Sequence, residues 1–135
     1  MKSPRRAVIV LSMIRLLLLT KDFDHYSTKY RVLQYLDILR DGGVACTHRR
    51  FPRSLFQWGR TLKEGGRNDI LFIQKRKLNM VELALLRKIA GLRIMYDIDD
   101  AVMFSRSRPE STLPMRRYER MARRCRMVTV GNSFL

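Results

Sequence analysis

The chain has 135 residues, and 28 Lys and Arg residues against 12 Asp and Glu residues give it a formal net charge of +16 at pH 7. This length fits one domain, because domains commonly contain about 100–200 residues. The hydrophobic content of 46% excludes intrinsic disorder, since a core can form. Cys46 and Cys125 lie far apart and outside any Cys-x-x-Cys motif. They therefore indicate neither a disulfide scaffold nor a zinc site, and a reducing, cytoplasmic compartment is expected.

The apolar run at residues 7–19 follows three basic residues, as in a signal sequence. However, Arg15 interrupts the run, no small-x-small cleavage site follows it, and it is shorter than the roughly 20 residues that span a bilayer. We therefore interpret residues 1–12 as an upstream extension, with Met13 as a candidate natural start. Residues 13–135 are then a single domain.

Short apolar runs recur along the chain and have the length of buried parallel strands. They start near residues 14, 44, 70, 92 and 127. Between them lie helical patterns at residues 27–40, 53–64, 80–90 and 115–126. Regular alternation of strand and helix predicts an α/β class fold: a Rossmann-like, doubly wound parallel sheet of about five strands. We expect the sheet to be incomplete at its C-terminus.

Local signals support the boundaries of these helices. The pair Gly42-Gly43 ends the first helix, and Asn79 with Glu82 resembles a capping box at the start of the third. In the second helix, Leu55, Phe56 and Trp58 are expected in the core. The last helix is amphipathic, with one face formed by Met115, Tyr118, Met121, Ala122 and Cys125.

The motif Tyr96-Asp97-Ile98-Asp99-Asp100 places three carboxylates at the end of the predicted fourth strand. In doubly wound sheets, ligands collect at the carboxyl ends of the strands. Crowded carboxylates favour a raised pKa and could bind substrate or act as a base. Capping or tethering of a loop is an alternative role, and two carboxylates at i and i+2 could also chelate a divalent metal, although no further metal ligand is identifiable nearby.

Three segments in this order are similar to a known family. They are Ser27-Thr28-Lys29-Tyr30-Arg31, the Tyr96–Asp100 motif and Val130-Gly131-Asn132-Ser133-Phe134-Leu135. Together they resemble the N-terminal half of GT-B-fold glycosyltransferases related to glycosyl transferase group 1. The resemblance implies the acceptor-side domain of an enzyme that moves a sugar from a nucleotide-sugar donor to an acceptor.

By this resemblance, Asp99 and Asp100 are the expected catalytic residues. The expected substrate-binding residues are Ser27, Lys29, Arg31, Asp97 and Asn132, although Arg31 could equally be a surface charge. No metal and no cofactor are expected beyond the nucleotide-sugar substrate. Because the donor-binding half has no counterpart here, we expect a truncated chain that is inactive by itself and self-associates through uncovered sheet surface.

Positive charge is concentrated in three places along the sequence. Two groups are Arg49, Arg50 and Arg53, and Lys75-Arg76-Lys77; the third is six arginines between residues 116 and 126. Such groups bind nucleic acid or an anionic membrane, or form a solvated helix face. No sequence motif for nucleic-acid readout is visible, which favours peripheral contact with a membrane at its inner face over nucleic acid. The alternative function is therefore a small, basic, non-catalytic α/β protein that binds nucleic acid or an anionic surface.

Overall fold

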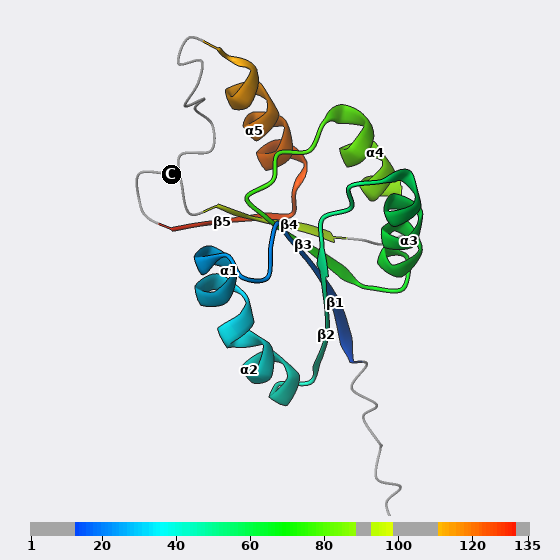
Figure 1. The fold of residues 1–135 in the computed structure, drawn as a ribbon, viewed down its shortest axis with the longest axis vertical. Helices are drawn as coiled ribbons and strands as arrows, with labels where there is room; N and C mark the ends of the chain where they lie inside the picture. The colour runs from blue at the N-terminus through cyan, green and yellow to red at the C-terminus, as the bar shows by residue number, and fades with distance from the viewer. Residues whose placement is uncertain (1–12, 89–92, 99–110, 132–135) are drawn as a thin grey trace, which may run out of the picture.

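Continuous apolar runs, rather than alternating ones, form the strands because helices cover both faces of the sheet. The computed structural model describes residues 13–88, 93–98 and 111–131 (Figure 1). The strands are β1 (Ile14–Thr20), β2 (Val44–Arg50), β3 (Ile70–Gln74), β4 (Arg93–Ile98) and β5 (Met127–Val130). In this described part they form one sheet in the order β2-β1-β3-β4-β5, and every neighbouring pair is parallel. The predicted Rossmann-like, doubly wound α/β fold is confirmed.

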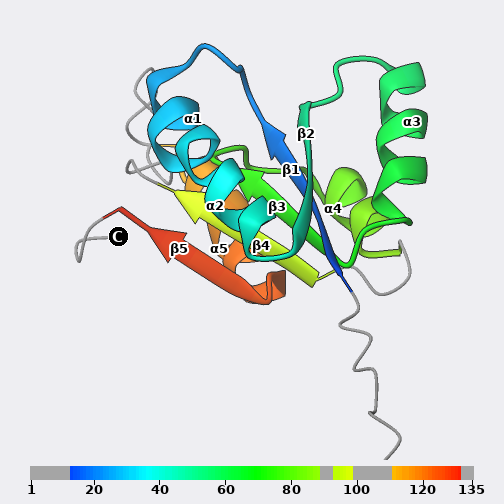
Figure 2. The same cartoon turned by 90° about the horizontal axis from the view of Figure 1, so that it is seen from below.

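The helices form two layers around the sheet. They are α1 (Tyr26–Arg31), the 3-10 turn η1 (Leu33–Tyr35), α2 (Leu36–Asp41), α3 (Leu55–Gly65), α4 (Met80–Lys88) and α5 (Leu113–Arg124). Figure 1 shows α1 and α2 on one side of the sheet and α3, α4 and α5 on the other. In Figure 2, turned by 90°, α1 and α2 lie in front of the strands. The strand order therefore reverses between β1 and β3, and the helices change sides at the same point.

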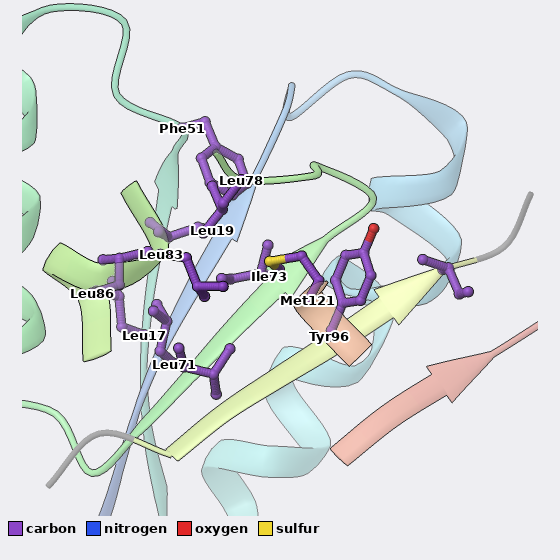
Figure 3. Packing of buried hydrophobic residues seen from close by; sticks show 12 residues of the cluster. Leu17, Leu19, Phe51, Leu71, Ile73, Leu78, Leu83, Leu86, Tyr96 and Met121 are labelled. Carbon is purple, nitrogen blue, oxygen red and sulfur yellow. The ribbon is translucent and has the colours of Figure 1, made fainter. Parts of the chain in front are cut away.

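The apolar side chains fill two cores, one on each face of the sheet. Side chains alternate along β1, so that Leu17 and Leu19 join one core and Leu16 and Leu18 join the other. Figure 3 shows the larger core, in which Leu71, Ile73 and Tyr96 lie among side chains of α4 and α5. On the opposite face, Val32 and Leu36 pack in one cluster with Leu16 and Leu18.

Two local expectations were wrong. Residues 27–40 are not one helix, because Val32 leaves the helical conformation at φ −128° and ψ −65° and separates α1 from η1. Leu55 and Phe56 are not core residues, since they are 91% and 83% exposed. Ser54 caps α3 and places both side chains in its first turn, whereas Trp58 and Leu62, one helical turn apart, pack against the core.

The helix boundaries read from capping signals are confirmed. Asn79 N–H donates to Glu82 Oε2 at 2.9 Å, and Glu82 N–H donates to Asn79 Oδ1 at 2.8 Å, which is a reciprocal capping box. After α2, Gly43 adopts φ +84°, where residues other than glycine are strained. The capping box gives hydrogen-bond partners to backbone N–H groups at the start of α4, and Gly43 turns the chain after α2.

Leu71 tests how tightly the larger core is packed. It is fully buried in central strand β3, so Leu71→Ala should lower the free energy of unfolding by about 2–5 kcal/mol through lost burial and a residual cavity. Urea denaturation measures this loss. Ile38→Ala, at a side chain that is 67% exposed, is the control and should change stability by less than about 0.5 kcal/mol. Equal effects would contradict the packing described here.

An exposed ion pair joins the amino ends of β1 and β3. Arg15 donates from Nε and Nη2 to the Asp69 carboxylate at 3.1 and 2.9 Å, and its backbone N–H donates to Asp69 Oδ2 at 2.8 Å. The Arg15 side chain and then its backbone N–H lower the pKa of Asp69 from 3.8 to about 2. The carboxylate is thus charged in the folded chain at a pH where it is protonated in the unfolded chain.

This depressed pKa predicts a pH dependence. The stabilisation from Asp69 is fully present above pH of about 4 and is lost as the pH falls through about 2. Asp69→Asn should therefore bring the stability of the variant closer to that of the wild type as the pH is lowered from about 5 to 2. Urea midpoints across this range measure the difference. A constant difference between the two proteins would contradict the assignment.

Candidate functional site

The carboxyl ends of the parallel strands gather buried polar side chains at one edge of the sheet. Thr20 ends β1, Gln74 ends β3, and Asp97 is the penultimate residue of β4, while Thr28 approaches from α1. All four are buried. Buried polar groups need hydrogen-bond partners. The partners at this edge show which side chains are already bonded within the fold and which could meet a ligand.

Arg31 and Asp97 are committed largely to each other. Arg31 donates from Nε to Asp97 Oδ2 at 2.9 Å and from Nη2 to Oδ1 at 2.5 Å, which is a bidentate pair. Thr129 of β5 donates its hydroxyl proton to Asp97 Oδ1 at 2.6 Å. The Asp97 side chain is 5% exposed, and Arg31 is 26% exposed. The network therefore ties α1, β4 and β5 together and explains why a carboxylate is tolerated in the sheet.

Thr28 and Gln74 occupy the place where the strand order reverses. The Thr28 hydroxyl donates to Gln74 Oε1 at 3.0 Å, and both side chains are buried. No partner in the structure lies within hydrogen-bonding distance of Gln74 Nε2 in the part of the chain that is described. Ligands of doubly wound folds commonly bind outside this reversal point, and here a side chain of α1 packs against it.

The predicted site residues are only partly brought together. Arg31 and Asp97 meet, whereas Lys29 is exposed on α1 and the Ser27 N–H bonds His25 Nδ1 at 3.3 Å. Asp99, Asp100 and Asn132 lie outside the described residues. Within residues 13–88, 93–98 and 111–131, no cluster of three or more His, Cys, Asp or Glu side chains could hold a metal ion.

A pocket of about 470 Å³ lies beside this edge, between the end of β2 and α3. One wall is a face of α3, and the other is the end of β2 with the segment that follows it. Its lining consists of Phe23, His48, Arg49, Arg50, Phe51, Pro52, Arg53, Gln57, Arg60, Thr61 and Glu64. The basic group Arg49, Arg50 and Arg53 was visible in the sequence, but its convergence with α3 and with Phe23 was not. The sequence also placed Phe23 shortly after β1 and Phe51 directly after β2, which was a further signal for this pocket.

The charges of the pocket are held in defined positions. Glu64 accepts from Arg49 Nε at 3.0 Å and lies 3.4 Å from Arg60 Nε. Burial alone would raise the pKa of Glu64, but the hydrogen bonds and charges of these two arginines keep it below its ordinary value. Burial, and then the charge of Arg49, lowers the pKa of His48, whose Nε2 lies 2.8 Å from the Thr20 hydroxyl. His48 is therefore neutral at pH 7.

A second basic surface lies on α5. Tyr118, Met121 and Cys125 face the core, while arginines occupy an arc of roughly 120° on the other side of the helix at 100° per residue. With the arginine that follows the helix, they are Arg116, Arg117, Arg120, Arg123, Arg124 and Arg126. None of the six is within salt-bridge distance of a carboxylate of the described residues. We call these six residues the arginine face.

Comparisons with known proteins place the fold but not the activity. No family model matches the chain, and no curated protein matches it. A similar solved structure is that of a protein described as pilus assembly-related, from Burkholderia pseudomallei K96243. The match has a TM-score of 0.52 and 22% sequence identity, and covers 87% of this chain and 78% of that one. At this identity the likeness shows a shared fold alone.

The resemblance to group 1 glycosyltransferases is wrong on these findings. The family comparison returns no such family, and the similar structure belongs to a protein described in terms of pilus assembly. The physical reason lies in the segments that suggested it. Polar residues after apolar strands occur at the carboxyl edge of any doubly wound sheet, and Arg31 and Asp97 pair with each other here. The chain is therefore not assigned to the GT-B glycosyltransferases.

Stability measurements test whether the Arg31–Asp97 pair is structural. Arg31→Met would leave Asp97 buried without its cation and should lower the free energy of unfolding by about 3–5 kcal/mol. Arg40→Met is the matched control, because it breaks an Arg40–Asp37 pair whose side chains are 51% and 90% exposed. The control should cost less than about 1 kcal/mol. Similar stability of the two variants would instead leave Arg31 available for a ligand.

Proposed function

We propose that this chain is a non-catalytic α/β module that binds the surface of an anionic membrane. The observation that carries the proposal is the arginine face of α5, six guanidinium groups without a carboxylate partner among the described residues. Elsewhere in the described chain, arginines such as Arg15, Arg31 and Arg49 are paired with carboxylates. The electrostatic field of these six positive charges attracts an anionic partner outside the chain.

The burial of its apolar stripe determines how α5 can meet a membrane. Met121 is fully buried, and Tyr118 and Cys125 pack against the core. The helix therefore has no free apolar stripe to insert among lipid chains, and its contact is electrostatic. Each arginine near an anionic lipid surface contributes about 1 kcal/mol, and salt screens this attraction.

Exposed apolar residues favour a membrane over nucleic acid as the partner. In this fold the helices run antiparallel to the strands, so the first turns of α3, α4 and α5 lie at the carboxyl edge. Those turns expose Leu55, Phe56, Met80, Val81 and Leu113. Burial, and then the charge of Arg117, lowers the pKa of Lys77. Cations therefore lie near these first turns. Apolar side chains beside cations suit the interface of a bilayer.

Nucleic-acid binding finds less support on α5. Single strands are usually bound by basic grooves with exposed aromatic residues for base stacking. On α5 the aromatic residue is Tyr118, and its ring lies 6.5 Å from that of Tyr96 in the core.

Within the described residues, no helix has the length and hydrophobicity to cross a bilayer. The attachment that we propose is peripheral, at the inner face of a membrane.

Vesicle binding tests this function. The variant Arg120→Gln, Arg123→Gln and Arg124→Gln should bind vesicles containing phosphatidylserine about 100-fold more weakly than the wild type, because three contacts of about 1 kcal/mol each are lost. Raising the salt from about 0.05 to 0.5 M should weaken wild-type binding as well. Cosedimentation across lipid concentrations measures both effects.

The matched control carries the same change in charge at other sites. Arg67→Gln, Arg87→Gln and Arg93→Gln leave the arginine face intact and should retain most of the binding. Phe56→Ser should weaken vesicle binding while leaving any DNA or RNA binding unchanged. Equal binding to neutral and anionic vesicles would overturn the proposal, and so would tighter binding to nucleic acid than to vesicles at the same salt concentration.

A further inference from the structure

We propose that the pocket between β2 and α3 is a binding site for a phosphate monoester carried on a small flat or apolar group. This proposal goes beyond membrane attachment and does not rest on the arginine face, because the pocket uses different residues on different elements. Its volume of about 470 Å³ falls within the range of small-molecule sites, about 300–1,000 Å³.

The charge of the pocket suits a dianion. Four guanidiniums line it, those of Arg49, Arg50, Arg53 and Arg60. Two carboxylates neutralise part of this charge, since Glu64 binds Arg49 and Arg60 and Asp22 lies 3.4 Å from Arg50. Two positive charges therefore remain in excess. A phosphate monoester carries a charge of about −1.5 to −2 at pH 7 and would balance them.

Arg53 and Arg50 are the side chains best placed to hold the phosphate. No carboxylate of the described residues lies within salt-bridge distance of Arg53, and its backbone N–H is fixed by Gln57 Oε1 at 2.7 Å. The Arg50 guanidinium lies over the Phe23 ring, 4.7 Å from its centroid. The ring and Asp22 thus orient this arginine before a ligand arrives, which reduces the entropy lost on binding.

Aromatic side chains give the pocket an apolar wall beside its cations. Phe23 packs against His48 with ring centroids 4.4 Å apart, and Phe51 is almost fully buried beneath Arg76. Inorganic phosphate would leave the partly exposed Phe23 ring uncovered, whereas a nucleoside or a short alkyl group esterified to the phosphate would contact it. Neutral His48, bonded to Thr20, adds polar surface without adding charge.

Phosphate monoesters come from two sources, soluble metabolites and the headgroup of phosphatidic acid, and both share the chemistry that this pocket recognises. Calorimetric titration of the full chain with inorganic phosphate, glycerol 3-phosphate and AMP tests for a soluble ligand. Vesicles with phosphatidic acid or phosphatidylserine at matched charge test for a lipid. We expect saturable binding of AMP that is tighter than that of inorganic phosphate.

Matched variants decide between a pocket and a general electrostatic field. Arg53→Gln and Arg50→Gln should each weaken binding of the monoester about tenfold or more, because each removes a charge-assisted contact. Arg67→Gln makes the same change in charge outside the pocket and should leave the affinity within about twofold. Both pocket positions are exposed, so these variants should fold, which thermal unfolding can verify.

The outcomes separate this proposal from the proposed membrane function. The variant with three α5 arginines replaced should still bind AMP, even if the arginine face has no role at membranes. A preference for phosphatidic acid over phosphatidylserine that disappears in Arg53→Gln would identify the lipid as the source, and soluble binding without that preference would identify a metabolite. Absence of saturable binding to every probe, or equal weakening in Arg67→Gln, would overturn the proposal.

Discussion

All five described strands run parallel, and this constraint determines where the buried polar side chains and the basic pocket lie. Parallel strands need crossover helices, so all strand ends and all helix starts meet at one edge of the sheet. The buried Arg31–Asp97 pair, the Thr28–Gln74 hydrogen bond and the basic pocket are all found there. The same geometry that buries both faces of the sheet therefore brings buried polar side chains and the basic pocket together at the carboxyl edge.

The charges of the described chain are divided between those paired inside the fold and those exposed on its surface. The buried charge of Asp97 is paired with the Arg31 guanidinium and accepts a hydrogen bond from the Thr129 hydroxyl. An unpaired buried charge would cost several kcal/mol. On α5 the arginines are left without carboxylates, which the fold tolerates because water solvates them. Net charge of +16 is thus not spread evenly: local acidic partners neutralise the structural arginines, and the excess collects on surfaces that a partner can reach.

Much of the fold could be predicted from sequence, because the signals are local. The run Leu16–Leu19 has no polar interruption, and such a run is typical of a strand buried on both faces. Capping at Asn79 depends on a residue only three positions away. The break at Val32 was not visible, because it depends on how α1 and α2 pack on the sheet, and the first turn of α3 was misread because exposure of Leu55 depends on where that helix begins.

The site could be predicted only in part, because its contacts join residues that are distant in sequence. Asp97 was predicted to bind substrate, and its place at the end of an apolar run drew attention to it, yet its partner Arg31 is 66 residues away. Short motifs cannot distinguish a polar side chain that binds a ligand from one that holds the sheet together, since both occur at strand ends. The pocket shows the same limit, because its arginines and phenylalanines are visible in the sequence but their convergence with α3 is not.

The pocket of this protein does not lie at the point where the strand order reverses. Doubly wound proteins commonly bind ligands outside that point, but here Thr28 of α1 packs onto Gln74 there. The open volume lies instead at the edge strand β2, against α3. A shared fold with a solved structure at 22% identity therefore does not transfer a ligand site to this chain. Binding at this pocket depends on the residues of β2 and α3 themselves, where guanidinium groups outnumber carboxylates.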